Sequence, residues 1–185
     1  MVNTPERIKV GEQMPDISLP AAVDARRQEI RLSDYRGKWL VLFFYSKDAT
    51  SVCQSEVRDF HARFEQFEQA GAAVVGASAD SLDSHRQWLD KPRASQRSAA
   101  SQSSIGTLKF PLLSDEGGAV SRSLGIFLEE KGIPLRGTYI IDPEGKLRWL
   151  LVHEPFVARN LEEVLRVLKA LQTGEPCPVG WKPPG

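Results

Sequence analysis

Two apolar runs in the N-terminal half of the chain carry no charged residues and predict buried strands. They are WLVLFFY at 39–45 and AAVVGASA at 72–79. Uninterrupted runs of this length, rich in β-branched, aromatic and small residues, are typical of strands covered on both faces. Upstream, residues 17–31 read as a hairpin, and a polar turn leads from it into the first run. We therefore expect a sheet preceded by a hairpin.

The segment between the two runs has the periodicity of an amphipathic helix. Gly71, a residue suited to the left-handed position after a helix, is expected to close it. A second helix is predicted around 82–90. The polar stretch 93–104 predicts a loop, either a spacer or a contact for a partner. The apolar stripe of the first helix consists of Val57, Phe60, Phe64 and Phe67.

The C-terminal half predicts three further units. Residues 110–126 read as a short strand, a turn and a short helix, and residues 136–154 as strand, turn and strand. Asn160 is placed to cap a last helix, with Glu163 at the reciprocal position of a capping box. The buried stripe of that helix is Leu161, Val164, Leu165, Leu168 and Leu171.

The order of these elements, βαβ followed by ββα, predicts a thioredoxin-like α/β fold. We expect a central mixed β-sheet flanked by helices, with an N-terminal hairpin extension and an extended C-terminal tail. The division we expect is a thioredoxin-like domain at 1–172 and a tail at 173–185. A fold alone does not assign a reaction, so the reaction must be inferred from individual side chains.

Composition narrows the choice of partners. Twenty-four basic residues balance twenty-four acidic ones, which gives no general electrostatic case for nucleic acid or an anionic membrane. The N-terminus lacks the apolar core of a signal peptide, and no stretch is long and apolar enough for a membrane span. Two cysteines without a C-x-x-C motif favour redox thiols in a cytoplasmic protein over a disulfide scaffold. The three histidines lack triad or metal spacing, so solvated or hydrogen-bonded roles are expected for them.

Cys53 is the strongest candidate for chemistry. It follows a buried strand and opens a helix, where unpaired backbone N–H groups and the helix dipole favour a thiolate. A helix terminus contributes about 0.3–1 kcal/mol, and up to ~2 kcal/mol when partly buried. A strongly activated thiolate needs roughly 3 kcal/mol of preferential stabilisation. The sequence must therefore supply a further partner for the sulfur.

Two residues are candidates for that partner. Thr50, three positions before Cys53, can cap the helix and bring its hydroxyl close to the thiol, although a plain helix cap beside an ordinary cysteine explains the spacing equally well. Arg136 starts a strand, and in this fold that strand end can lie beside the start of the cysteine helix. The alternative is an edge-strand arginine in water.

Cys177 lies in the proline-rich tail TGEPCPVGWKPPG, where regular structure is excluded. An exposed thiol on such a tail suits attack on an oxidised cysteine, which would produce a disulfide through sulfenic acid chemistry. An incidental surface cysteine is the alternative.

Taken together, these residues resemble the peroxiredoxin family, specifically its typical two-cysteine (AhpC/TSA-like) branch. The similar segments span nearly the whole chain: LSDYRGKWLVLFFYSKDATSVCQSE, DSLDSHRQWLDKPR, FPLLSD, RGTYIIDPEGKLRW and EPCPVGWKPPG. The resemblance implies a thiol-dependent peroxidase for hydrogen peroxide and organic hydroperoxides. It requires no metal, haem or flavin.

The resemblance also implies roles for particular residues. Cys53 would be the peroxidatic cysteine, while Thr50 and Arg136 would orient and polarise the peroxide. Glu56 would hold the arginines, of which Arg159 would be the second. Cys177 would resolve the sulfenic acid of the partner subunit as a Cys53–Cys177 disulfide, and thioredoxin or a similar dithiol would reduce that disulfide. The assembly implied is a homodimer, in many members a ring of five dimers.

The chain departs from the family pattern at two positions. Ser46 and Gln54 stand where prolines are usual, and the first of those prolines shields the thiolate from water. Two alternatives to an efficient peroxidase therefore stay open. One is a slow redox sensor or oxidation-triggered chaperone, and the other is a non-catalytic thioredoxin-fold binding module in which Cys53 ionises like an ordinary cysteine.

Overall fold

A seven-stranded mixed sheet forms the centre of the computed structural model, which describes residues 8–90 and 104–183. The strand order is β2-β1-β5-β4-β3-β8-β9. Its strands are β1 (Ser18–Val23), β2 (Arg26–Arg31), β3 (Trp39–Phe44), β4 (Ala72–Ser78), β5 (Leu112–Ser114), β8 (Arg136–Ile141) and β9 (Leu147–His153). The helices are η1 (Leu32–Tyr35), α1 (Ser51–Ala62), α2 (Phe64–Gln69), α3 (Leu82–Leu89), α5 (Ala119–Ser123) and α6 (Leu161–Thr173). A small second sheet pairs β6 (Phe127–Leu128) with β7 (Ile133–Pro134).

The pairing of the strands confirms the predicted thioredoxin-like α/β class. β3, β4 and β5 are parallel, whereas β8 runs antiparallel to β3, and β9 antiparallel to β8. The N-terminal hairpin is β1 and β2, and β1 joins the sheet beside β5. Its turn places Asp24 and Ala25 at φ 49° and 59°, the left-handed pair that a two-residue hairpin loop requires.

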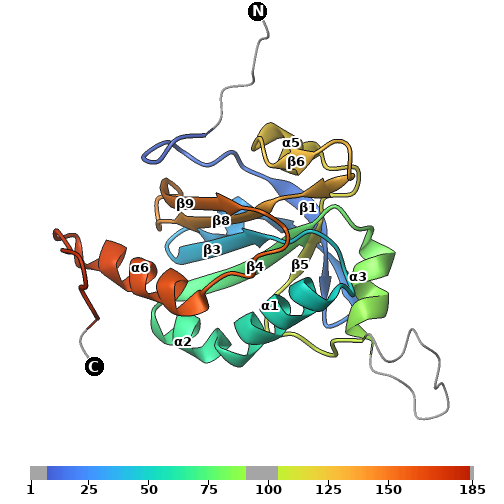
Figure 1. The fold of residues 1–185 in the computed structure, drawn as a ribbon, viewed down its shortest axis with the longest axis horizontal. Helices are drawn as coiled ribbons and strands as arrows, with labels where there is room; N and C mark the ends of the chain where they lie inside the picture. The colour runs from blue at the N-terminus through green and yellow to red at the C-terminus, as the bar shows by residue number, and fades with distance from the viewer. Residues whose placement is uncertain (1–7, 91–103, 184–185) are drawn as a thin grey trace, which may run out of the picture.

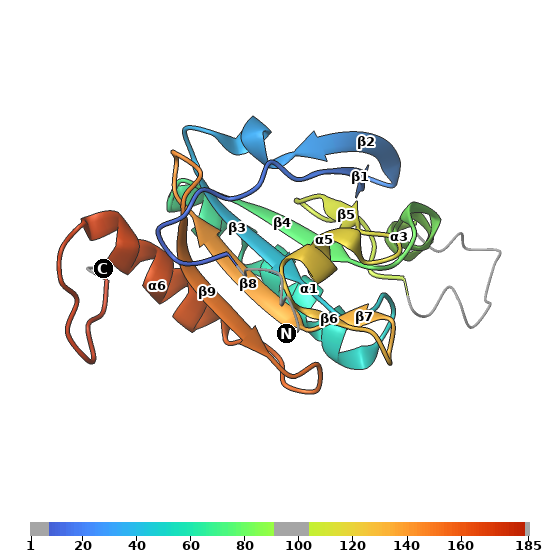
Figure 2. The ribbon, with the colours of Figure 1, turned by 90° about the horizontal axis from the view of Figure 1, so that it is seen from above.

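Helices and loops cover the sheet on both faces and divide the core into two clusters (Figures 1 and 2). On one face α1, α2, α3 and α6 pack against the sheet, and the cluster between them includes Phe43, Phe60 and Leu168. On the other face the N-terminal segment, η1 and α5 cover a second cluster that includes Met14 and Leu124. The central strands are buried on both faces, which explains why they lack charge.

The prediction of a single helix between β3 and β4 is wrong in one respect, because the segment forms two helices, α1 and α2. Arg63 separates α1 from α2 with φ −97° and ψ 5°, outside the helical region. The bend lets Phe67 become fully buried against Phe60, with ring centroids 5.8 Å apart. Phe64 is half-buried and stacks against Phe110, which also contacts Phe60. Tertiary packing of aromatic rings therefore overrides the straight-helix pattern.

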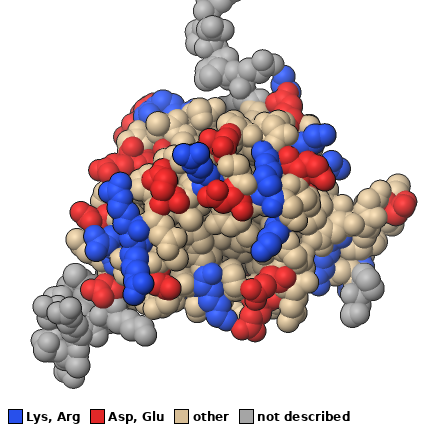
Figure 3. All heavy atoms as spheres, turned by 180° about the vertical axis from the view of Figure 1, so that it is seen from behind, with Lys and Arg blue, Asp and Glu red and all other residues tan. Residues whose placement is uncertain are grey.

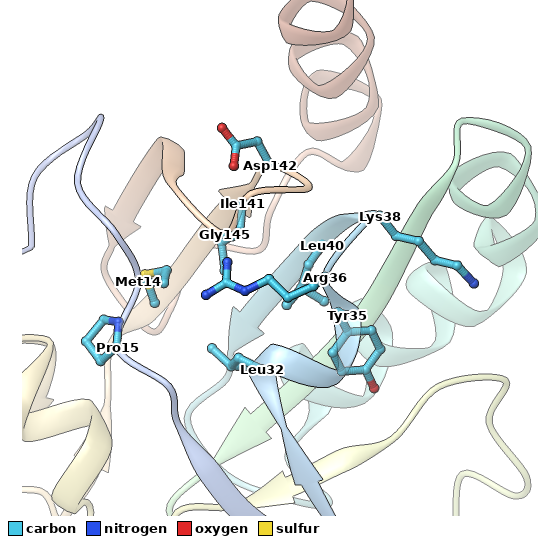
Figure 4. Close-up of a pocket in the computed structure, with 10 residues that line it drawn as sticks. All are labelled: Met14, Pro15, Leu32, Tyr35, Arg36, Lys38, Leu40, Ile141, Asp142 and Gly145. Atoms are coloured by element: carbon cyan, nitrogen blue, oxygen red, sulfur yellow. The ribbon is translucent and has the colours of Figure 1, made fainter.

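A small hollow beside the end of β8 shows how tightly the N-terminal segment packs (Figure 4). Arg36 extends over the turn after β8 and donates from Nη1 to the Glu144 carbonyl oxygen at 2.5 Å. Gly145 adopts φ +80°, and a Cβ there would overlap the Arg36 guanidinium. The remaining space is about 10 Å³, which is room for about one water molecule and no larger ligand.

Charged side chains of both signs are interspersed on the face opposite to that of Figure 1 (Figure 3). None of the described helices is long and apolar enough to cross a membrane. Most of the loop predicted at 93–104 lies outside the described residues, which resume at 104.

Asn160 caps α6 as predicted. Its side-chain oxygen Oδ1 accepts hydrogen bonds from the backbone N–H groups of Glu162 and Glu163, at 3.0 and 3.2 Å. The reciprocal half of the predicted capping box is wrong, because the Glu163 carboxylate accepts bonds from Arg166 instead. The cap therefore depends on Asn160 alone.

Asn160→Ala is expected to lower the free energy of unfolding by about 1 kcal/mol, because two N–H groups lose their acceptor. Urea unfolding followed by circular dichroism measures the change. Asn160→Asp, which keeps an acceptor oxygen, serves as the control and should stay close to wild type. An alanine variant as stable as wild type would contradict the assignment of the cap.

Candidate active site

Cys53 lies in the first turn of α1, directly after the loop that leaves β3. Its side chain is fully buried. Thr50 is the residue before α1, but its side chain does not cap the helix as expected. The hydroxyl instead donates to the Lys47 carbonyl oxygen at 3.0 Å, and only the Thr50 backbone carbonyl accepts from the helix, from the N–H of Gln54 at 2.8 Å.

A buried network holds the loop between β3 and α1, and the sequence alone did not indicate it. The Asp48 carboxylate accepts from the Tyr45 hydroxyl at 2.7 Å and from Ser84 Oγ at 2.7 Å. His85 Nδ1 lies 2.8 Å from the same carboxylate, and His85 Nε2 lies 3.0 Å from the Leu113 carbonyl oxygen. Burial and the Asp48 charge raise the pKa of Tyr45 well above its ordinary value. His85 is thus a hydrogen-bonded core histidine, as expected, and the network fixes the loop before Cys53.

Arg136 lies beside the start of α1, where the fold was expected to bring it. Both terminal guanidinium nitrogens, Nη1 and Nη2, are 3.5 Å from Cys53 Sγ. The residue is 1% exposed, so the alternative of a solvated edge-strand arginine is wrong. Its Nε and Nη2 donate to the Pro155 carbonyl oxygen at 2.8 and 2.5 Å, which sets the orientation of the guanidinium plane.

Glu56, one helical turn after Cys53, joins two arginines. Its Oε2 accepts from Nη1 of Arg136 and, at 2.9 Å, from Nη1 of Arg159. Its Oε1 accepts from the Arg159 backbone N–H at 2.8 Å. Residues three apart lie on the same face of a helix, so Cys53 and Glu56 point toward the same end of β8.

Arg159 is held by further contacts with two strands, β8 and β3. Its Nε donates to Thr138 Oγ1 at 2.7 Å, and its Nη2 donates to the carbonyl oxygens of Gly137, at 2.9 Å, and Phe44. Burial lowers the pKa of Arg159 to about 10, so the side chain remains cationic at neutral pH. Thr138 was not foreseen, although its position two residues after Arg136 places both side chains on the same face of β8.

The charges of the buried cluster around Cys53 do not cancel. Arg136 and Arg159 contribute two positive charges and Glu56 one negative charge, which leaves an excess that a Cys53 thiolate would balance. His153, which pairs with Arg136 between β8 and β9, experiences the same excess of positive charge. Burial lowers its pKa first, and the positive charge of Arg159 lowers it further.

A cavity of about 330 Å³ opens beside Cys53. Thr50 and Arg136 also line it, and Pro155 and Phe156 contribute apolar surface. Because Cys53 itself is 0% exposed, its sulfur lies at the wall of the cavity and away from open solvent. Among the described residues no group of three or more His, Cys, Asp or Glu side chains is arranged to hold a metal ion.

The fold does not place Cys177 in contact with Cys53 of the same chain. Both are free thiols, and the Cys177 sulfur contacts Thr173 Oγ1 at 3.7 Å and the carbonyl oxygen of Glu175 at 3.5 Å. These contacts leave Cys177 half-buried against the end of α6, where an exposed thiol was expected. Figure 1 shows the tail beyond the C-terminal end of α6. Thr50, Glu56, Arg136 and Arg159 surround Cys53, and Cys177 lies apart.

Comparison with known proteins places the chain in a family. Residues 10–150 match the model of the AhpC/TSA family. A putative peroxiredoxin in the rubredoxin operon of Clostridium pasteurianum is 42% identical over 174 residues, which is 93% of this chain and 94% of that protein. Peroxiredoxin-2 of Mus musculus is 40% identical over 179 residues, covering 95% of this chain and 87% of the relative.

Solved structures agree with these sequences. The reduced 2-Cys peroxiredoxin of Plasmodium vivax superposes with a TM-score of 0.84 at 28% identity, covering 94% of this chain and 89% of that one. AhpC of Enterococcus faecalis gives a TM-score of 0.79 at 26% identity, covering 94% and 100%. The chain is therefore a peroxiredoxin, a member of the AhpC/TSA family of peroxidases.

Proposed function

We propose that the protein reduces hydrogen peroxide and organic hydroperoxides with Cys53 as the nucleophile. The observation that carries the proposal is the Arg136 guanidinium, which lies 3.5 Å from the sulfur in a buried cluster with one positive charge in excess. The thiolate attacks the terminal oxygen, the S–O bond forms and the O–O bond breaks. The product at Cys53 is a sulfenic acid, and water or an alcohol leaves.

The other residues near the sulfur take supporting roles in this proposal. Arg136 stabilises the thiolate and the charge that develops as the O–O bond breaks, which is stronger stabilisation of the transition state than of the ground state. The Thr50 hydroxyl donates a hydrogen bond to the Lys47 carbonyl oxygen, so its own oxygen offers lone pairs to the O–H of a hydroperoxide. Glu56 and Arg159 hold Arg136 in place.

The second half of the cycle assigns Cys177 as the resolving cysteine of a partner subunit. Its thiol attacks the Cys53 sulfenic acid, water leaves and a Cys53–Cys177 disulfide forms between subunits. Thioredoxin or a similar dithiol protein then reduces the disulfide. The division into residues 1–172 and a tail from 173 suits this role, because α6 ends at Thr173 and Gly174 follows in a left-handed conformation.

The homodimer that this scheme needs has a candidate surface at β9. This strand is an edge of the main sheet, and its outer side has no neighbouring strand among the described residues. Leu151 and Val152 are exposed on it, at 38% and 37%. An unpaired edge with apolar side chains favours pairing with a second copy. Assembly of such dimers into a ring of five remains an expectation from the family.

The test is a stopped-flow reaction of the fully reduced protein with hydrogen peroxide, followed by tryptophan fluorescence. We expect a second-order phase faster than free cysteine at the same pH by about 10²-fold or more, because the buried guanidinium is already oriented toward the sulfur. Protein alkylated at its thiols beforehand is the control and should show no such phase. A rate equal to that of free cysteine would favour the redox sensor or the binding module.

A further inference from the structure

Ser46 is a buried side chain of the Cys53 cavity whose hydroxyl has no hydrogen-bond partner. It lies in the loop after β3, is 7% exposed and lines the same cavity as Thr50, Cys53 and Arg136. Its Oγ is buried and makes no hydrogen bond within the described residues. A buried hydroxyl without a partner is unfavourable, so a ligand that bonded to it would gain affinity.

Other buried serines in the described part of the chain are bonded, which makes Ser46 an exception. Ser78 donates to the Asp80 carboxylate at 2.7 Å, and Ser114 donates to the Asp80 carbonyl oxygen at 2.8 Å. Ser121 donates to the Asp115 carboxylate at 2.7 Å. Among the buried serines that the structure describes, the one that lines the Cys53 cavity is therefore the one whose hydroxyl has no partner, and a ligand in the cavity could supply it.

The hydrogen-bond donors of Arg136, which is also buried at the cavity, already have partners. Arg136 has five N–H groups, and its described contacts are two with the Pro155 carbonyl oxygen, one with Glu56 and two with Cys53 Sγ. The hydroxyl of Thr50, an exposed residue, donates a hydrogen bond to the Lys47 carbonyl oxygen. In this arrangement Ser46 is the buried cavity side chain with a proton free to donate.

We propose that the Ser46 hydroxyl donates a hydrogen bond to the leaving oxygen of the hydroperoxide. The inference rests on the proposed peroxidase function and adds a second contact for the substrate. Thr50 accepts from the substrate O–H, the Cys53 thiolate attacks the terminal oxygen, and the electron pair of the O–O bond moves to the other oxygen. The alkoxide or hydroxide that leaves takes a proton from solvent, and Ser46 keeps its own proton throughout.

Ser46→Ala is expected to slow the reaction with hydrogen peroxide about tenfold, which corresponds to ~1.4 kcal/mol. Ser46→Pro also removes the hydroxyl and should be equally slow, whereas Ser46→Thr keeps a hydroxyl and should recover most of the rate. Ser123→Ala, an exposed serine in α5, is the matched control and should react like wild type. All variants are measured by stopped flow as the full chain.

A second readout separates an effect on the substrate from an effect on the thiol. Alkylation of Cys53 by iodoacetamide uses the same thiolate but breaks no O–O bond, so Ser46→Ala should leave its rate unchanged. The urea midpoint should not fall, because the substitution removes an unsatisfied buried group. A loss confined to the peroxide reaction supports the proposal.

Several outcomes overturn it. Alanine or proline at position 46 that reacts as fast as wild type or faster would show that the hydroxyl is not used. An equal loss in alkylation would place Ser46 at the thiol, and a threonine variant as slow as alanine would remove the requirement for a hydroxyl. A wild-type chain without a fast peroxide phase would overturn the peroxidase proposal as well, which distinguishes the two failures.

Discussion

Replacing Arg136 with methionine is expected to slow the reaction of Cys53 with hydrogen peroxide by about 10²- to 10³-fold, the effect of removing a preorganised charge donor from a buried site. Methionine is apolar and close in length, so it fills much of the same space. Both guanidinium contacts with Sγ disappear. The measurement is the stopped-flow second-order rate constant, with Cys53→Ser as the zero reference.

The charges that remain explain why this loss should be chemical and not structural. Without Arg136, Glu56 is still paired with Arg159 at 2.9 Å, and that pair is neutral. The excess positive charge beside Sγ is then gone, so Cys53 should react slowly with iodoacetamide too. Slow alkylation in the methionine variant therefore separates it from Ser46→Ala, which should alkylate normally.

Arg136→Lys tests geometry at constant charge. A single ammonium group has three donors and cannot reproduce two contacts with Sγ, one with Glu56 and two with Pro155. We expect an intermediate rate. Arg122→Met, which removes an exposed arginine paired with Glu129, is the matched control and should leave the rate unchanged. A methionine variant as fast as wild type would contradict the role of Arg136.

The sequence predicted the parts of the site that follow from local pattern. Cys53 was found because a buried strand runs into a helix start, and Arg136 because an arginine is unusual in a strand of apolar residues. Both signals depend on a few neighbouring residues and on the order of elements. The resemblance to peroxiredoxins then added Glu56 and Arg159.

Other features depend on contacts that no local pattern carries. Asp48 contacts His85, which lies 37 positions away in the sequence, and Arg159 contacts Phe44, which lies 115 positions away. Neither contact could be predicted from local spacing. The expected Thr50 cap is absent because the hydroxyl donates to the Lys47 carbonyl oxygen instead. The bend at Arg63 was not predicted, because it accompanies the packing of Phe67 against Phe60, which the periodicity of the segment does not specify.

Cys177→Ser is expected to leave the first peroxide turnover fast but to stop cycling with a dithiol protein. Cys53 and its surrounding charges are unchanged in this variant, and the Cys177 contacts all lie at the end of α6 and in the tail. The sulfenic acid then has no thiol in the protein to attack it. Stopped flow measures the first step, and a coupled assay with thioredoxin, thioredoxin reductase and NADPH measures the second. Sustained turnover would remove Cys177 from the cycle.

Mixing two inactive variants decides whether the disulfide joins two subunits. A disulfide needs Cα atoms within about 7 Å, whereas Cys53 is fully buried in α1 and Cys177 lies beyond α6. Cys53→Ser refolded together with Cys177→Ser gives mixed dimers that hold one intact pair across the interface. We expect peroxide to produce a disulfide-linked dimer on a non-reducing gel and to restore part of the cycling. If the bond forms within one chain, the mixture stays inactive, because neither variant carries both thiols.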